Sequence, residues 1–179
     1  MSKIGKISIQ IPEKVKVLLS GTNINIEGPL GKKSLNIDLE MFDLNIKEGK
    51  EVSIKPKKID QISKRLWGMN RSLLNNAIIG ASKGYEKILE LVGVGFRASL
   101  KGKQLNLQLG FSHDVNFEIP EGIKISVEKQ TILKISGLDK QLVGMIASKI
   151  KSIRPPEPYK GKGIKEQGQY ILRKEGKKK

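Results

Sequence analysis

The 179-residue sequence contains no cysteine and only one histidine, His113. The absence of thiols excludes disulfide frameworks, thiolate metal sites and cysteine nucleophiles, and it fits a reducing compartment. A single imidazole does not build a multi-histidine metal centre. The sequence therefore predicts no metal site and no cofactor, and it offers little support for catalysis.

Long apolar runs and aromatic side chains are also scarce. Runs such as Ile88-Leu89-Glu90-Leu91-Val92 are far too short to span a membrane, and the polar start at Met1–Lys6 lacks the apolar region of a secretion signal. We therefore expect a cytosolic or organelle-internal protein. Aromatic residues make up only 4% of the chain, which disfavours stacking-led recognition of single strands and favours binding to the backbone of a folded RNA.

Positive charge, in contrast, is abundant. Thirty-four Lys and Arg against eighteen Asp and Glu give a net charge of +16 and a pI near 9.9. Lysine and arginine gain free energy by displacing counterions condensed on nucleic acid, so this balance favours a phosphate-rich partner. A surface that serves only solubility is the plainer alternative, and an anionic membrane is another. Membrane binding predicts a basic helix face opposite bulky apolar residues, whereas the basic C-terminus carries Gly and Pro.

The charge is concentrated at the two ends of the chain. Residues 1–83 carry a balance of +7, residues 84–148 only +1, and residues 149–179 a balance of +8 from eleven basic and three acidic residues. The last stretch contains Pro156-Glu157-Pro158-Tyr159-Lys160-Gly161-Lys162-Gly163-Ile164, a stiff basic loop with almost no helix or strand potential. A segment so charged is expected not to bury itself, so it is either a solvated tail or a surface for an anionic partner.

An internal repeat indicates two related halves. The stretch Ile11-Pro12-Glu13-Lys14-Val15-Lys16-Val17 matches Ile119-Pro120-Glu121-Gly122-Ile123-Lys124-Ile125, and Ile24–Gly28 matches Ile132–Gly137. The alternation of apolar residues predicts a hairpin in each half, the first one broken at Ser20-Gly21-Thr22. Further strands are predicted at Leu35–Leu39, Glu51–Ile54, Ala98–Leu100 and Leu105–Leu109, with a turn at Lys101-Gly102-Lys103.

Each half then closes with a predicted helix. In the first half an apolar stripe recurs every three or four residues and is expected to lie on a sheet; it consists of Ile59, Ile62, Leu66, Met69, Leu73 and Ala77. Trp67, beside the stripe, is expected at the edge of the core. In the second half a shorter helix, capped by Asp139 and ended by Pro155 and Pro156, is marked by Leu142, Val143, Ile146 and Ile150.

These elements predict an α+β fold of two similar small domains related by duplication. Each domain is expected to be an antiparallel-rich sheet covered by a helix, and a basic C-terminal extension follows the second domain. The predicted boundaries are 1–83, 84–154 and 155–179.

Two short motifs suggest chemistry but have simpler interpretations. Gly93-Val94-Gly95-Phe96-Arg97-Ala98 matches a dinucleotide-binding fingerprint in its letters, yet the residues after it alternate with the period of a strand instead of opening a helix. We expect a glycine bulge or bend there. His113 precedes Asp114, but consecutive residues on a turn do not assemble a catalytic triad, so a local hydrogen bond is the expected role.

The C-terminal loop has the chemistry of an RNA contact. Its prolines restrict the backbone, so docking loses less entropy. Lys160 and Lys162 supply charge, Tyr159 stacks or packs between them, and Gly161 and Gly163 let backbone N–H groups approach phosphate oxygens. The residues predicted to bind RNA are Lys149, Lys151, Arg154, Tyr159, Lys160, Gly161, Lys162, Gly163, Arg173 and Lys174.

Several of these segments resemble the bacterial-type ribosomal protein L6 (uL6) family of the large subunit. The resemblance covers essentially the whole chain, and its segments are Pro156–Ile164, Asp139-Lys140-Gln141, Gly93–Ala98, Leu109-Gly110-Phe111-Ser112-His113 and Arg71–Asn76. It implies two α+β domains related by duplication and bound to 23S-type ribosomal RNA near the sarcin-ricin loop and the translation-factor site. It also implies that the C-terminal domain makes the principal RNA contacts, through Tyr159, Lys160, Gly161, Lys162 and Gly163.

The resemblance also implies the partners and the place of work. The expected partners are large-subunit rRNA, neighbouring ribosomal proteins and nearby translation factors, with no membrane and no homo-oligomer. The expected location is the large subunit of a cytoplasmic or organellar ribosome, and the expected role is not enzymatic. The alternatives are an extra-ribosomal RNA-binding protein or RNA chaperone and, more distantly, a phosphate-ester enzyme that uses His113.

Overall fold

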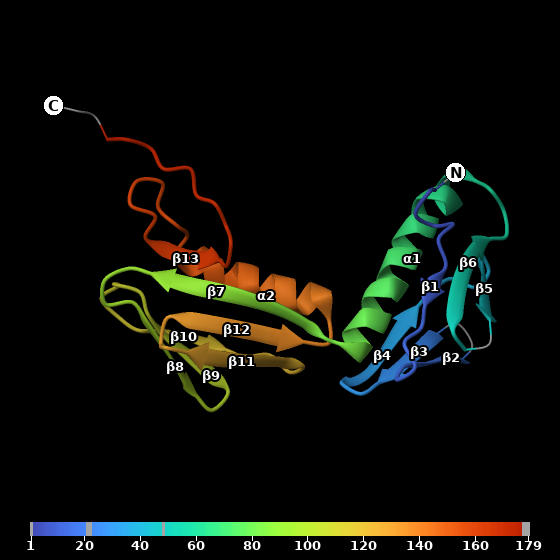
Figure 1. Ribbon diagram of the computed structural model, residues 1–179, viewed down its shortest axis with the longest axis horizontal. Coiled ribbons are helices and arrows are strands. Elements are labelled where there is room, and N and C mark those ends of the chain that lie inside the picture. The colour runs from blue at the N-terminus through green and yellow to red at the C-terminus, as the bar shows by residue number, and fades with distance from the viewer. Residues whose placement is uncertain (1, 21–22, 48, 177–179) are drawn as a thin grey trace. The chain divides into compact units, whose positions relative to one another are not determined.

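The computed structural model describes residues 2–20, 23–47 and 49–176 (Figure 1). Its contacts divide the chain into two compact units, Met1–Gly84 with Leu138–Lys140 and Tyr85–Gly137 with Gln141–Lys179. Each unit has one helix, several antiparallel strands and a separate hydrophobic core among these residues. The fold is therefore α+β.

The first unit contains two three-stranded antiparallel sheets. One has the order β2 (Lys16–Ser20), β3 (Asn23–Gly28) and β4 (Gly31–Asn36). The other has the order β1 (Ile9–Gln10), β6 (Glu51–Pro56) and β5 (Phe42–Lys47). The hairpin predicted from alternation is confirmed as β2 and β3, and Gly21 and Thr22 of its predicted break lie outside the described residues.

Helix α1 (Gln61–Ser82) contacts β3, β4 and β6, so it packs on both sheets. It begins after Asp60, whose backbone N–H donates a 2.9 Å hydrogen bond to the Ser63 hydroxyl. This bond satisfies an amide at the helix start. The helix ends at Ser82, and Gly84 just beyond it has a φ of +76° that favours glycine and donates its N–H to the Gly80 carbonyl.

The prediction that the apolar stripe of this helix faces the core is wrong. Ile59, Ile62, Met69 and Leu73 are 63%, 60%, 50% and 41% exposed, and only Ala77 of the stripe is buried. The face turned to the core instead consists of Ser63, Trp67, Asn70, Leu74, Ala77, Ile78, Gly80 and Ala81.

Close packing explains which face is buried. A Cβ added at Gly28 of β3 would overlap the Ala81 carbonyl oxygen, so the sheet and the last turns of α1 approach closely. Only the face with small residues at that end permits such an approach. Trp67 fills the wider end, where its indole N–H donates a 2.7 Å hydrogen bond to the Ile54 carbonyl. Its predicted position at the core is confirmed, with 8% exposure.

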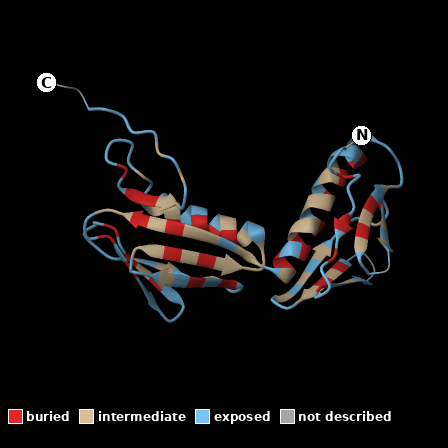
Figure 2. Ribbon diagram, in the orientation of Figure 1, coloured by how far each residue is buried: buried red, intermediate tan, exposed pale blue. Residues whose placement is uncertain are grey.

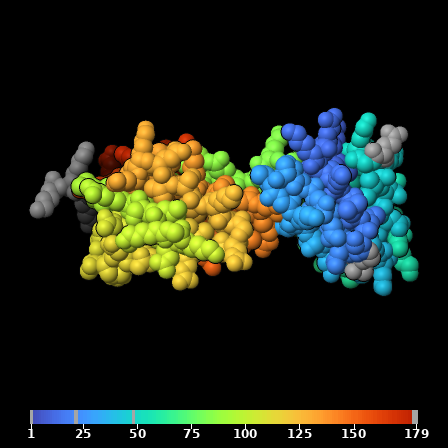
Figure 3. Space-filling model, turned by 90° about the horizontal axis from the view of Figure 1, so that it is seen from below, coloured from blue at the N-terminus to red at the C-terminus, as the bar shows by residue number. Residues whose placement is uncertain are grey.

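The second unit has a four-stranded antiparallel sheet with the order β11 (Ile123–Glu128), β12 (Ile132–Gly137), β7 (Tyr85–Val92) and β13 (Gly163–Glu166). A three-stranded sheet has the order β10 (Val115–Glu118), β9 (Gln104–Gln108) and β8 (Arg97–Lys101). Strand β8 also contacts β11, and Figure 3 shows the yellow-green and yellow segments of this part next to one another on the surface.

Helix α2 (Lys140–Ile153) buries Val143, Ile146, Ala147 and Ile150 in the core of the second unit. The core side chains of β7 and β12 belong to the same cluster, which appears as the red bands on these strands in Figure 2. The helix ends before Pro155 and Pro156, as predicted, because neither proline can donate a helical hydrogen bond. No helix of the described residues is long and apolar enough to cross a membrane.

Candidate nucleic-acid interface

The basic C-terminal segment is folded into the second unit by strand β13. Gly163–Glu166 pairs antiparallel with Leu89–Val92 of β7, and the Ile164 side chain is fully buried in the core. The expectation that this segment has no strand potential and stays unburied is therefore wrong. One apolar residue among many charges is enough, because the neighbouring strand supplies hydrogen bonds and counter-charges.

Those counter-charges are two cross-strand ion pairs. Lys165 Nζ lies 2.9 Å from a carboxylate oxygen of Glu90, and Lys87 Nζ lies 3.1 Å from Glu166 Oε2. Lys151 of α2 lies 3.4 Å from the other oxygen of Glu166. The hydrogen bond from Lys87, aided by the nearby positive charge of Lys151, holds the pKa of the Glu166 carboxyl below its usual range.

The chain turns from α2 into β13 over a close backbone contact. The Ile164 N–H donates a 2.8 Å hydrogen bond to the Arg154 carbonyl. Gly163 has a φ of +141°, and a Cβ there would lie 2.6 Å from the Pro155 carbonyl oxygen and the Pro156 Cα. Gly163 is buried, so it contributes close packing within the protein.

Between these points, residues 157–162 form a closed loop. The Glu157 N–H donates to the Lys162 carbonyl at 2.8 Å, and the Gly161 N–H donates to the Glu157 carbonyl at 3.0 Å. The loop presents Lys160 and Lys162 to solvent, together with Tyr159, which is 52% exposed. The N–H of Gly161 is already bonded within the loop, so the sequence-based expectation that this N–H faces phosphate is corrected.

The last described residues return along the same loop. The Gln167 N–H donates to the Ile88 carbonyl at 3.0 Å, and the Lys174 N–H donates to the Pro158 carbonyl at 2.9 Å. The Arg173 guanidinium lies over Gly161, 3.6 Å from where a Cβ would stand. The fold therefore brings Arg173 and Lys174 to the loop that carries Lys160 and Lys162.

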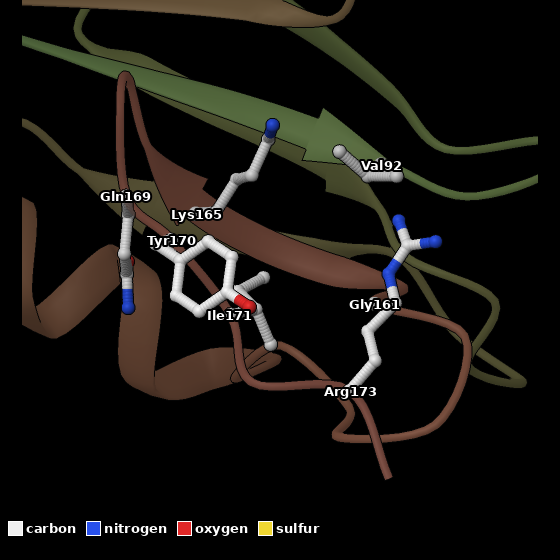
Figure 4. A pocket seen from close by; sticks show the side chains of 7 residues that line it. All are labelled: Val92, Gly161, Lys165, Gln169, Tyr170, Ile171 and Arg173. Atoms are coloured by element: carbon white, nitrogen blue, oxygen red, sulfur yellow. The ribbon is translucent and has the colours of Figure 1, made fainter. Parts of the chain in front are cut away.

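A shallow pocket of about 380 Å³ lies where the returning segment faces β7 and the loop. Figure 4 shows the side chains of Tyr170 and Arg173 bordering it from the returning segment and that of Lys165 extending from β13. Its full lining is Val92, Gly161, Lys165, Gln169, Tyr170, Ile171 and Arg173. Tyr170 and Gln169 were not among the predicted binding residues.

The predicted basic residues differ in the charge that they offer to a partner. Six of them are exposed and form no ion pair with a carboxylate of the described residues: Lys149, Arg154, Lys160, Lys162, Arg173 and Lys174. Lys151, in contrast, forms an ion pair with Glu166. The surface formed by the six unpaired cations is called the basic face below.

An aromatic pair extends this end of the second unit and was missed by the sequence analysis. The rings of Phe111 and His113 stack with centroids 6.4 Å apart, and the Arg154 guanidinium lies 5.0 Å from the Phe111 centroid. A cation over a ring face is attracted by the ring's quadrupole, so Phe111 favours this position of the Arg154 side chain. Both rings belong to the segment Leu109–His113 singled out above for its resemblance.

The two motifs with chemical alternatives have structural roles. Gly93–Phe96 is a turn between β7 and β8, with a strand where a dinucleotide site needs a helix, and a Cβ at Gly93 would lie 2.8 Å from the Phe96 ring. Asp114 accepts hydrogen bonds from the side-chain amides of Asn106 and Gln108. Among the described residues, no group of His, Asp and Glu has the arrangement of a metal site.

Comparisons with known proteins agree on one family. A family model described as ribosomal protein L6 matches residues 92–167. The large ribosomal subunit protein uL6 of Caulobacter vibrioides is 49% identical over 180 residues, and that of Beijerinckia indica is 46% identical over 179 residues. The uL6 protein of Magnetococcus marinus is 45% identical over 179 residues. Each match covers the whole of both chains.

Proposed function

This chain belongs to the ribosomal protein L6 family, and from that premise we propose that it is a structural, non-catalytic component of the large ribosomal subunit. In this role it binds 23S-type rRNA through the basic face. Its neighbours are other ribosomal proteins, and it works near the sarcin-ricin loop and the translation-factor site of a cytoplasmic ribosome.

The single observation that carries the RNA-binding proposal is the state of the basic face. Its six cations have no ion pair among the described residues, while helix α2 holds the backbone of Lys149, and backbone hydrogen bonds hold Arg154, Lys162 and Lys174. Charges that are ordered before binding lose less entropy when they meet phosphates, and each phosphate contact releases counterions. Residues 155–179 are therefore an RNA-binding segment anchored to the second domain by its own strand.

We also infer that the two domains arose by duplication. In the first hairpin Val17 faces Ile26, and in the second Ile125 faces Ile135, so the matched sequences have matched registers. A glycine also ends the second strand of each hairpin, Gly28 in the first and Gly137 in the second. The shared register and the shared terminal glycine support common descent.

The salt dependence of rRNA binding tests the proposal, and the chain contains a matched control. Lys160-Gly161-Lys162 and Lys101-Gly102-Lys103 both have two exposed lysines around a glycine at positive φ, +71° and +60°. The slope of log K against log salt is negative for wild-type binding. In the Lys160→Ala/Lys162→Ala variant it is expected to become less negative by about one unit for each phosphate that the loop no longer binds. Lys101→Ala/Lys103→Ala removes the same charge and is expected to leave the slope close to that of the wild type. Equal slopes for the two variants would refute direct contact by the loop.

Sedimentation separates a ribosomal component from a free RNA chaperone. The tagged chain is expected to co-migrate with large subunits at moderate salt. Recovery only in the slow fractions with short RNA would favour the chaperone.

A further inference from the structure

The first unit has an apolar groove that the RNA-binding proposal does not use. It has a volume of about 470 Å³ and lies between the N-terminal segment, β6 and the start of α1. This volume falls within the ~300–1,000 Å³ typical of ligand pockets. The lining of the groove includes Ile54, Ile59 and Trp67 on the apolar wall and Lys6, Lys55 and Lys64 at the rim.

The apolar wall of the groove is preformed. The indole N–H of Trp67 is bonded to the Ile54 carbonyl, and Gly5 lies so close that a Cβ there would be 2.6 Å from the ring. The ring is therefore fixed in place without a ligand. Ile59, at the mouth, is 63% exposed and is available for an incoming apolar side chain.

The rim of the groove carries three positive charges. Lys6, Lys55 and Lys64 are exposed, and none of them forms an ion pair within the described ranges 2–20, 23–47 and 49–176. The lining includes no Asp or Glu. An apolar wall with a cationic rim complements a ligand that has an apolar side chain between carboxylates.

Other occupants fit less well. RNA would use the lysines but would leave Ile59 and the apolar wall without a partner. A second copy of this chain would bring together two surfaces from units whose residues 1–83 each carry +7.

We propose that this groove, named here the Trp67 groove, docks an acidic segment of another protein. One apolar side chain of that segment packs against Trp67 and Ile59, and its flanking carboxylates pair with Lys6, Lys55 and Lys64. The site lies outside the basic face, so it is independent of the proposed rRNA contact.

Fluorescence offers a direct test because Trp67 is the only tryptophan of the chain. The full-length protein is titrated with a synthetic peptide of Leu and Glu in which the leucines have helical i, i+3, i+4 spacing. A saturable change in Trp67 emission is expected. Replacing every leucine of the peptide by alanine is expected to weaken binding at least about tenfold, because alanine buries much less apolar surface against the wall.

Protein variants complete the test. Ile59→Glu places a carboxylate at the mouth of the groove, and Lys6→Ala/Lys55→Ala/Lys64→Ala removes the positive charges of the rim. Each variant is expected to weaken peptide binding about tenfold or more and to leave the circular dichroism spectrum unchanged. The control Lys14→Ala/Lys47→Ala/Lys50→Ala removes the same charge from exposed positions outside the lining and is expected to have little effect. Equal loss in both triple variants, or equal binding of the alanine peptide, would overturn the proposal.

Two further ligands test the class of partner. Poly(U) RNA and phosphatidylglycerol vesicles are added to the same protein. Neither ligand is expected to bind in the groove. Any change in Trp67 emission that they cause should therefore be the same in the wild type and in Ile59→Glu. Such a change with either one would overturn the assignment to a protein partner.

Discussion

The two units use comparable hairpins but complete their sheets differently. In the first, β2, β3 and β4 form a three-stranded sheet under α1. In the second, the corresponding hairpin of β11 and β12 is extended by β7 and then by β13, which comes from the basic C-terminal segment. The second unit thus builds a highly charged segment into its own sheet, and the first unit has no counterpart in the described residues.

This difference explains how a charged segment acquires a fixed shape. Ile164 supplies the apolar contact, while Lys165 and Glu166 are neutralised by partners on the neighbouring strand and helix. Among the described residues, Lys160 and Lys162 before β13 and Arg173 and Lys174 after it form no ion pair. Anchoring by a few residues therefore leaves most of the charge for a partner.

The largest expected effect comes from removing the anchor. Ile164→Ala is expected to lower the free energy of unfolding of the second unit by about 2–5 kcal/mol, because it leaves a cavity in the core. Urea unfolding followed by far-UV circular dichroism measures it, while Trp67 fluorescence reports on the first unit alone.

Leu172→Ala is the matched control, since Leu172 is 71% exposed in the same C-terminal segment. It is expected to change stability by no more than about 0.5 kcal/mol. Similar losses for the two variants would mean that β13 is not anchored as described.

Two adjacent leucines sharpen the comparison in the first unit. Leu74 is fully buried whereas Leu73, which belongs to the predicted stripe, is 41% exposed. Leu74→Ala is expected to cost about 2–5 kcal/mol and Leu73→Ala about 0.5 kcal/mol or less, measured by chemical denaturation. A larger loss of stability for Leu73→Ala than for Leu74→Ala would mean that the stripe predicted from the sequence does face the core.

These leucines also show which features of the fold a sequence pattern predicts and which it does not. Alternation identified the hairpins because a strand's inward positions are set by its period of two. On α1 two faces both have helical spacing, and the choice between them depends on the close approach of Gly28 to Ala81, which no local pattern contains. Strands β1, β5, β7, β10 and β13 were not predicted; β1 and β13 have only two and four residues, and their pairing is non-local.

A smaller effect is expected where the loop supports Arg173. Gly161 has a φ of +71°, so Gly161→Ala is expected to cost about 1–2 kcal/mol from backbone strain in the loop that contacts the Arg173 guanidinium. Gly168→Ala has the same type of strain at φ +76° with no atom near the added Cβ. Only Gly161→Ala is expected to weaken rRNA binding, in a filter-binding titration of both variants. Equal weakening of rRNA binding by the two variants would mean that Arg173 does not belong to the RNA interface.

The smallest effect concerns pH. Because the pKa of Glu166 is lowered by Lys87 and Lys151 in the fold, its ion pairs stabilise the protein above the unfolded glutamate pKa of about 4.3. That contribution is lost as the pH falls through the lower folded pKa. Glu166→Gln is expected to reduce stability at neutral pH and to reduce the loss on acidification, measured by thermal unfolding across that range. Glu175→Gln, at an exposed position, is expected to change neither; an unchanged acid profile for Glu166→Gln would contradict the pairing.

The candidate site was predicted in its residue types more than in its geometry. Composition and charge runs identify Lys160, Lys162, Arg173 and Lys174, because a solvated cation is visible in the sequence. The pairing of Lys151 with Glu166, the bonded N–H of Gly161 and the contact of Arg154 with Phe111 depend on residues that only the fold brings together.

The proposed function rests on a basic C-terminal segment that is already folded in the free protein. Amide hydrogen exchange of the free full-length chain tests this at Gly161, Ile164 and Lys174, whose N–H groups donate to Glu157, Arg154 and Pro158. The account predicts that all three exchange much more slowly than in the isolated peptide 155–179. Equal rates in the chain and the peptide would contradict it.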